Sequence, residues 1–201
     1  MSSGPTAGRQ RSPTAAAPDP DLPLVQRLAR GDQQACALLL DRHLDRIHGL
    51  ACRLLGDPAE AEDIAQETFL RAWRLAPDWQ PARARFSTWL HRVALNLCHD
   101  RLRRRRPEVD ADATPLTAGT TGPEGSGLAG ERADRVAAAV AALPGRQREA
   151  IVLRHYQELS QREAAEVMAV SEEALESLLA RARRSLRQAL ADEIDDEERP
   201  R

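Results

Sequence analysis

The sequence predicts an all-α protein with two small helical domains joined by a flexible linker, the second of them a helix-turn-helix. Apolar residues recur every three or four positions along the long segments, the spacing of helices that bury one face. Ala and Leu are abundant, aromatic residues are scarce, and the 13 Pro and 11 Gly fall mainly at the N-terminus and near 107–130. Because Pro and Gly interrupt helices, this clustering predicts two helical blocks with a linker between them.

The charge is near balance overall but uneven along the chain. All 29 basic residues are Arg, and residues 22–106 hold 15 Arg against 10 acidic residues, while the formal net charge is −2. A near-neutral chain with basic blocks can bind nucleic acid locally and stay soluble. The first 20 residues contain no apolar core for a signal peptide, and no apolar run is long enough to span a membrane. We therefore expect a cytoplasmic protein without stable membrane insertion.

The first domain is expected to cover residues 21–106. Residues 1–20 are rich in Pro, Ala, Ser and Gly and are predicted to form a disordered tail. A short helix is expected to begin near Asp21 and to break at Gly31-Asp32.

The second predicted helix runs from about residue 33 to 55, with Leu40 and Leu44 among the residues turned inward. The sequence Gly56-Asp57-Pro58 is expected to end it and to start the next helix. Asp57 suits the N-cap, and Pro58 suits the first helical position, where its missing N–H costs nothing.

The stretch 59–74 reads AEAEDIAQETFLRAWR and predicts an amphipathic helix. Its inner face carries Ala61, Ile64, Ala65, Thr68, Phe69 and Ala72. Its outer face carries Asp63, Gln66, Glu67, Leu70 and Arg74. A mixed polar face with Leu70 at its centre suits docking against another helix. Periodicity alone favours the plainer alternative, a solvated face with one stray Leu.

A loop at 77–85 contains one large aromatic residue, Trp79, and leads into a helix predicted over 86–106. The expected buried stripe of this helix is Phe86, Leu90, Val93, Ala94 and Leu97. The opposite side carries a polar ridge of Arg92, Asn96, His99 and Arg103, which ends in an Arg run. Arg can bind phosphates and Asn can bind base edges, so the ridge predicts nucleic-acid binding. The alternative is a solvated, Arg-rich helix end that is stabilised by the helix dipole.

Residues 107–131 lack periodicity and are expected to form the flexible linker. The second domain is expected over 132–190, with helices near 132–143 and 146–157, and an acidic tail at 191–201. Ser160 with Glu163 three residues later forms a capping box that predicts the start of a third helix.

A turn at Ala169-Val170 leads to Ser171, which is expected to cap the last helix. That helix exposes Ser177, Arg181, Arg184 and Arg187. Two short helices, a tight turn and a basic second helix predict a helix-turn-helix. A plain helical hairpin with solubilising Arg residues is the alternative.

Two separate blocks of sequence resemble one family. The first is AEAEDIAQETFLRAWR followed by FSTWLHRVALNLCHDRLRRR, and the second is LPGRQREAIVLRHYQELSQREAAEVMAVSEEALESLLARARRSLR. In this order and spacing they resemble the extracytoplasmic-function (ECF) group of bacterial RNA polymerase sigma factors. The resemblance covers residues 22–106 and 132–190, which are similar to sigma regions 2 and 4.

The resemblance implies roles for the residues of each block. The residues implied in docking on core RNA polymerase are Asp63, Gln66, Glu67 and Leu70. Those implied in melting and reading the −10 promoter element are Trp79, Arg92, Asn96, His99 and Arg103. Those implied in reading the −35 element are Ser171, Glu173, Ser177, Arg181 and Arg184. The implied partners are core polymerase, promoter DNA and an anti-sigma factor.

No residue pattern predicts a metal site, a cofactor or catalysis. Cys36, Cys52 and Cys98 lack ligand spacing, and His48 near Cys52 has no second cluster to complete a tetrahedral site. The sequence contains no phosphate-binding Gly loop and no nucleophile elbow. We expect a protein that is not an enzyme. A stand-alone helix-turn-helix regulator and a partner scaffold with a vestigial DNA helix are the alternatives to a sigma factor.

Overall fold

A computed structural model describes residues 19–80, 84–105 and 128–197 of the chain, and they contain helices and no strands. The helices of the first part are α1 (Leu22–Leu28), α2 (Gln33–Leu55), α3 (Pro58–Leu75), the 3₁₀ turn η1 (Ala76–Asp78) and α4 (Phe86–Arg105). Those of the second part are α5 (Leu128–Ala141), α6 (Gly145–Ile151), the π-helical turn η2 (Val152–Tyr156), α7 (Gln161–Met168) and α8 (Glu172–Glu197). The predicted fold class is confirmed.

The helix ends predicted from side-chain capping are confirmed. Asp57 accepts hydrogen bonds from the amides of the first turn of α3, and Pro58 occupies the first helical position. Ser160 and Glu163 form the reciprocal capping box of α7. The hydroxyl of Ser171 accepts from the amide of Ala174 at the start of α8. Each cap satisfies amides that a helix end leaves without intrahelical partners.

Two expected boundaries differ from the structure. The predicted linker at 107–131 ends earlier, because α5 begins at Leu128, and the predicted acidic tail from residue 191 is helical as far as Glu197. No Pro lies within 128–131 or 191–197, and Ala and Glu are good helix formers, so no Pro stops the helices in these parts. Residues 1–18 of the predicted tail and residues 107–127 of the predicted linker lie outside the described residues.

Another difference lies in the helix expected over 146–157. It ends at Ile151, and η2 follows with a wider turn in which the amide of Gln157 donates to the carbonyl of Val152. The turn carries Tyr156 and leads directly to Gln157 and Glu158, residues that contact the first domain.

In the first domain, α2, α3 and α4 pack against one another and α1 packs on α2. The face of α2 turned inward is the one with Leu39, His43 and Ile47, whereas Leu44 is 40% exposed. The expectation for Leu44 was wrong, because the neighbouring His43 takes the inward position, with its Nε2 2.8 Å from the buried carboxylate of Asp21.

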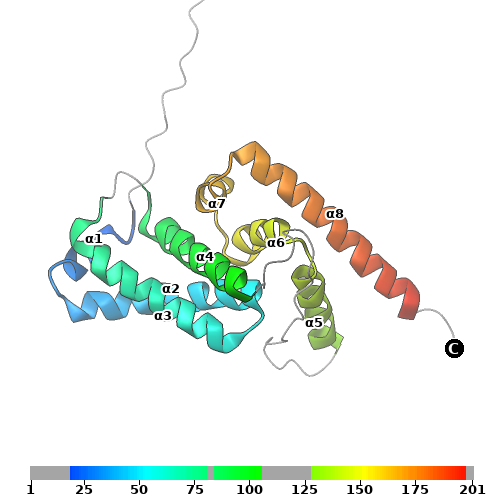
Figure 1. The fold of residues 1–201 in the computed structure, drawn as a ribbon, viewed down its shortest axis with the longest axis horizontal. Coiled ribbons are helices and arrows are strands. Elements are labelled where there is room, and N and C mark those ends of the chain that lie inside the picture. The colour runs from blue at the N-terminus through cyan, green and yellow to red at the C-terminus, as the bar shows by residue number, and fades with distance from the viewer. Residues whose placement is uncertain (1–18, 81–83, 106–127, 198–201) are drawn as a thin grey trace, which may run out of the picture.

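The two domains pack against each other. α4 contacts α7, and α2 contacts α6 and η2. Figure 1 shows α4 with α2 and α3 on one side and α6 and α7 on the other, while α8 runs along the outside of the second domain. The buried apolar residues of both domains form one contiguous cluster. No helix in the described ranges is both long and apolar enough to cross a membrane.

Candidate functional site

The outer face of α3 combines charge with exposed apolar surface. Asp63 and Gln66 are exposed, Glu67 is half-buried, and Leu70 is 40% exposed. Trp73, one helical turn beyond Leu70, is 48% exposed and was not singled out from the sequence. The i, i+3 spacing from Leu70 was the signal that could have found it. Two large apolar side chains framed by carboxylates make a surface suited to a protein partner.

A groove of about 250 Å³ lies beside this face, between α3 and α4. It is lined by Asp63, Ile64, Glu67, Arg71, Leu97, Asp100, Arg101 and Arg104. Within it Glu67 accepts from Arg71 at 2.8 Å, and Arg101 reaches Asp63 at 3.4 Å. The groove therefore carries both signs of charge along its length.

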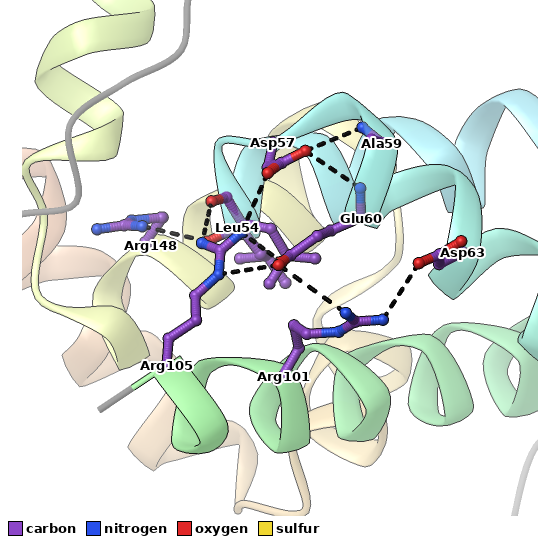
Figure 2. Close-up of polar contacts among 9 residues, drawn as sticks. Leu54, Asp57, Ala59, Glu60, Asp63, Arg101, Arg105 and Arg148 are labelled. Atoms are coloured by element: carbon purple, nitrogen blue, oxygen red, sulfur yellow. Dashed lines mark hydrogen bonds and ion pairs between the residues drawn. The ribbon is translucent and has the colours of Figure 1, made fainter. Parts of the chain in front are cut away.

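The C-terminal end of α4 is tied to the N-terminal end of α3 (Figure 2). Arg105 donates to the carbonyl of Leu55 at 2.9 Å and pairs with Glu60, and Asp57 lies 3.6 Å away. Arg101 also lies 3.9 Å from Glu60. Arg105, a member of the predicted Arg run, and the nearby Arg101 therefore hold the domain together. The acidic residues at 57, 60 and 63, spaced by one helical turn, were the sequence signal for ion pairs with these Arg side chains.

Arg103, at the end of the predicted polar ridge, remains available. Its side chain is 79% exposed, and it pairs only with the neighbouring Asp100 on the same helix among the contacts of the described residues. Asn96, in the middle of the ridge, is also exposed.

The other two ridge residues contact the second domain. Arg92 donates to the carbonyl of Glu166 on α7, and its guanidinium lies 3.8 Å from the Glu166 carboxylate. The Nε2 of His99 lies 2.8 Å from Oε1 of Glu149 on α6. The ridge is thus divided, with Asn96 and Arg103 facing solvent and Arg92 and His99 facing a domain distant in sequence.

Trp79 lies in an aromatic cluster at the start of α4. Its ring meets Phe86 edge-on at a centroid distance of 5.4 Å and Trp89 at 5.8 Å. The ring is half-buried, and its Nε1 has no hydrogen-bond partner among the described residues. An indole N–H usually finds a partner when buried, so this buried donor is an exception among the described residues.

Two aspartates just before α1, Asp19 and Asp21, contact α4 and α2 respectively. Asp19 accepts from the amide of Phe86 at 2.7 Å and from the amide of Asp21 at 3.0 Å. The Asp21 carboxylate is buried and contacts Arg42 and, at 2.8 Å, His43. Burial raises the pKa of Asp21, but the bonds and charges of His43 and Arg42 outweigh it and leave the pKa below its ordinary value.

The five residues predicted to read a second DNA site lie exposed on α8 or at its cap. They are Ser171, Glu173, Ser177, Arg181 and Arg184. Arg181 folds back to the carbonyl of Ser177 at 3.2 Å, and the other Arg of this face points to solvent. The carboxylate of Glu173 accepts hydrogen bonds from its own backbone amide and from the Ser171 side chain, and these bonds hold its pKa below the ordinary value. This face is basic, helical and uncovered.

Titratable groups elsewhere in the described residues show no feature of a metal cluster or of an activated thiol. No group of three His, Cys, Asp or Glu residues within the described ranges is placed to hold a metal. Burial raises the pKa of the Cys98 thiol to about 12, with a smaller contribution from Glu149. A thiol of that pKa is not a nucleophile at neutral pH.

Comparison with known proteins accounts for this layout. Residues 39–108 match the family description Sigma-70 region 2, and residues 133–186 match Sigma-70, region 4. The chain is 35% identical over 181 residues to the ECF RNA polymerase sigma factor SigW of Bacillus subtilis, covering 84% of this chain and 95% of SigW. The chain belongs to the ECF sigma factors.

Other relatives agree with this assignment to the ECF sigma factors. The chain is 35% identical over 182 residues to the RNA polymerase sigma-H factor of Pseudomonas aeruginosa, covering 85% of this chain and 93% of that protein. The solved structure of CnrH in complex with the cytosolic domain of CnrY matches with a TM-score of 0.65 at 32% identity, over 86% of this chain and 97% of that one. Sigma factors bind core RNA polymerase and promoter DNA, and they direct transcription initiation without being enzymes themselves. In this ECF sigma factor, α3 and α4 lie within region 2, and α7 and most of α8 lie within region 4.

Proposed function

We propose that the outer face of α3 docks this sigma factor on core RNA polymerase through Asp63, Gln66, Glu67 and Leu70. The observation that carries the proposal is the exposure of Leu70 and Trp73 on the face opposite a fully packed one. Burial of these two side chains against a helix of the polymerase would remove apolar surface from water, and the surrounding carboxylates would set partner and register.

Promoter DNA would then meet two separate surfaces. Trp79, Arg92, Asn96, His99 and Arg103 would melt and read the −10 element, with the Trp79 ring stacking on an extruded base. The exposed face of α8, with Ser171, Glu173, Ser177, Arg181 and Arg184, would read the −35 element in the major groove. Region 2 would then extend over residues 21–106 and region 4 over about 132–190.

Control by an anti-sigma factor completes the proposal. The structure of the relative CnrH has been solved in complex with the cytosolic domain of CnrY. An anti-sigma partner in the cytoplasm would compete for the same α3 surface and so keep the protein from binding polymerase. The protein itself would carry no catalytic activity and no cofactor.

A pull-down with purified core polymerase tests the docking face. Asp63→Arg combined with Leu70→Ala should reduce capture at least tenfold, because the pair changes the charge and the apolar centre of the face together. The matched control is Asp41→Arg combined with Leu38→Ala on α2, where Leu38 is 48% exposed. Capture unaffected by the α3 variant would contradict the proposal and favour a stand-alone helix-turn-helix regulator, which needs only α8.

A further inference from the structure

The exposed side of α8 carries its charges in a definite order along the helix. Leu175, Leu179 and Ala182 are buried on the opposite side. The outermost exposed residues, which recur at i, i+4, i+7 and i+11, are Glu173, Ser177, Ala180 and Arg184. These four residues, which we call the reading line, begin with a carboxylate, continue with two small side chains and end with a guanidinium.

The turn before α8 fixes Glu173 at the start of the reading line. Ala169 ends α7 in a left-handed backbone conformation, with a φ of 53°, and Ser171 caps α8 two residues later. Figure 1 shows α7 beside the start of α8, with the rest of α8 running away from it. The hydrogen bonds that the Glu173 carboxylate accepts from its own amide and from Ser171 hold it at the helix start. A carboxylate has about four lone-pair sites, so it can still accept from a ligand.

The length of the reading line assigns its two ends to different parts of a DNA duplex. In a helix-turn-helix the second helix lies in the major groove, and residues of its N-terminal part contact the base edges. The small side chains of Ser177 and Ala180 let this part of α8 approach the bases closely. Arg184 lies about 16 Å along the helix axis from Glu173, farther than the groove width of about 12 Å. Arg184 is therefore placed for a backbone phosphate, and Glu173 for a base.

An ionised carboxylate discriminates among bases because it accepts hydrogen bonds and donates none. In the major groove, guanine presents two acceptors, and thymine presents one acceptor and a methyl group. Adenine offers its N6 amino group next to the N7 acceptor, whose lone pair repels a carboxylate. Cytosine offers its N4 amino group alone. Because the DNA phosphates repel the charge of Glu173, a cytosine amino group is the base-edge partner that best offsets this repulsion.

We propose that Glu173 selects a cytosine within the −35 element by accepting a hydrogen bond from its N4 amino group. The inference rests on the proposed function, since it takes α8 as the helix that reads this element. Glu172 supplies a matched control, because it is exposed in the same first turn but lies about 100° around the helix from Glu173, outside the reading line. Both carboxylates stabilise the helix start through the helix dipole, so only base selection separates them.

Transcription of a template pool by core polymerase bound to the full chain tests this selection. One promoter that this holoenzyme uses has its −35 element randomised, and a transcribed barcode identifies the sequence of each template. The unaltered chain should favour cytosine at one position of one strand. Glu173→Gln should move the preference at that position to adenine, which an amide side chain binds through N6 and N7. The cytosine-to-adenine ratio there should fall at least about tenfold, with the other positions unchanged.

Glu172→Gln removes the same charge from the first turn of α8 and should leave every base preference as in the unaltered chain. If Glu173 only stabilised the helix, both variants would lower thermal stability and total transcription alike and alter no preference. That result, or an unaltered chain that favours no cytosine in the randomised element, would overturn the inference and leave the proposed function standing. A chain that directs no transcription from any template would remove the proposed function and the inference together.

Discussion

The imidazole Nε2 of His99 lies 2.8 Å from the carboxylate Oε1 of Glu149 and joins α4 of region 2 to α6 of region 4. Glu149 is 6% exposed, and its other oxygen is reached by Arg146 at 3.3 Å. A carboxylate removed from water to this extent needs its hydrogen-bond partners, because leaving a buried acceptor unsatisfied costs its desolvation free energy. His99, which we propose to read DNA, thereby also stabilises the packing of the two domains.

His99→Ala should lower the free energy of unfolding by about 1 to 3 kcal/mol, since it withdraws one partner from the buried carboxylate. Asn96→Ala, an exposed position on the same helix, should change it by less than about 0.5 kcal/mol. Urea unfolding followed by circular dichroism measures both. If His99→Ala changed the free energy of unfolding as little as Asn96→Ala, the His99–Glu149 contact would contribute nothing to stability.

Asp21 should make stability depend on pH in the acid range. Its folded pKa lies below the ordinary value of 3.8, so the folded state binds fewer protons than the unfolded state. Its stabilisation is complete above the unfolded pKa and is lost as the pH falls through the folded pKa. Asp21→Asn should lower the unfolding free energy at neutral pH and flatten its decline below about pH 4. Asp45→Asn on the exposed side of α2 is the control, and an unchanged acid profile in Asp21→Asn would contradict the assignment.

Asp19 should act as a cap for α4 from a distance of 67 residues in sequence. Asp19→Ala should cost about 1 kcal/mol, the usual price of losing an N-cap acceptor, and should speed hydrogen exchange in the first turn of α4. Asp19→Asn keeps an acceptor oxygen and should retain most of the protection. Exchange of the Phe86 amide that is equally fast in the parent chain and in Asp19→Ala would exclude the cap.

Cys98 should resist alkylation in the folded protein. With burial and the nearby Glu149 raising its pKa to about 12, only about one thiol in 10⁴ is ionised at pH 8. Cys36 and Cys52 are half-buried, so their thiols should react with iodoacetamide faster than Cys98. Peptide mass spectrometry measures the alkylation rate of each thiol, and denaturant should make the three rates similar. Rapid labelling of Cys98 in the native chain would mean that the core opens readily.

Features that depend on neighbouring residues in sequence were predictable. The caps at Asp57 and Ser160 follow from local hydrogen bonding within one helical turn, and the sequence shows both partners. The outward position of Leu70 on α3 follows from helical periodicity for the same reason.

Features that depend on docking were not predictable. On α4, Val93 and Leu97 were expected inside but are only half-buried, whereas Leu95 and Cys98 are fully buried. The expected buried stripe assumed that α4 is covered on one side only, but α7 packs on a second side of α4. A periodic pattern shows that a helix has a buried face without showing how many neighbours cover it.

Transcription reconstituted on genomic DNA tests the central claim that this chain directs initiation by core polymerase. Purified core polymerase is supplied with fragmented genomic DNA of the source organism, with and without the chain, and the 5′ ends of the transcripts are mapped. We expect new 5′ ends that appear only with the chain, share upstream sequence at the −10 and −35 positions, and disappear with Asp63→Arg combined with Leu70→Ala. A chain that binds polymerase yet yields no new 5′ ends, or ends without shared upstream sequence, would contradict it.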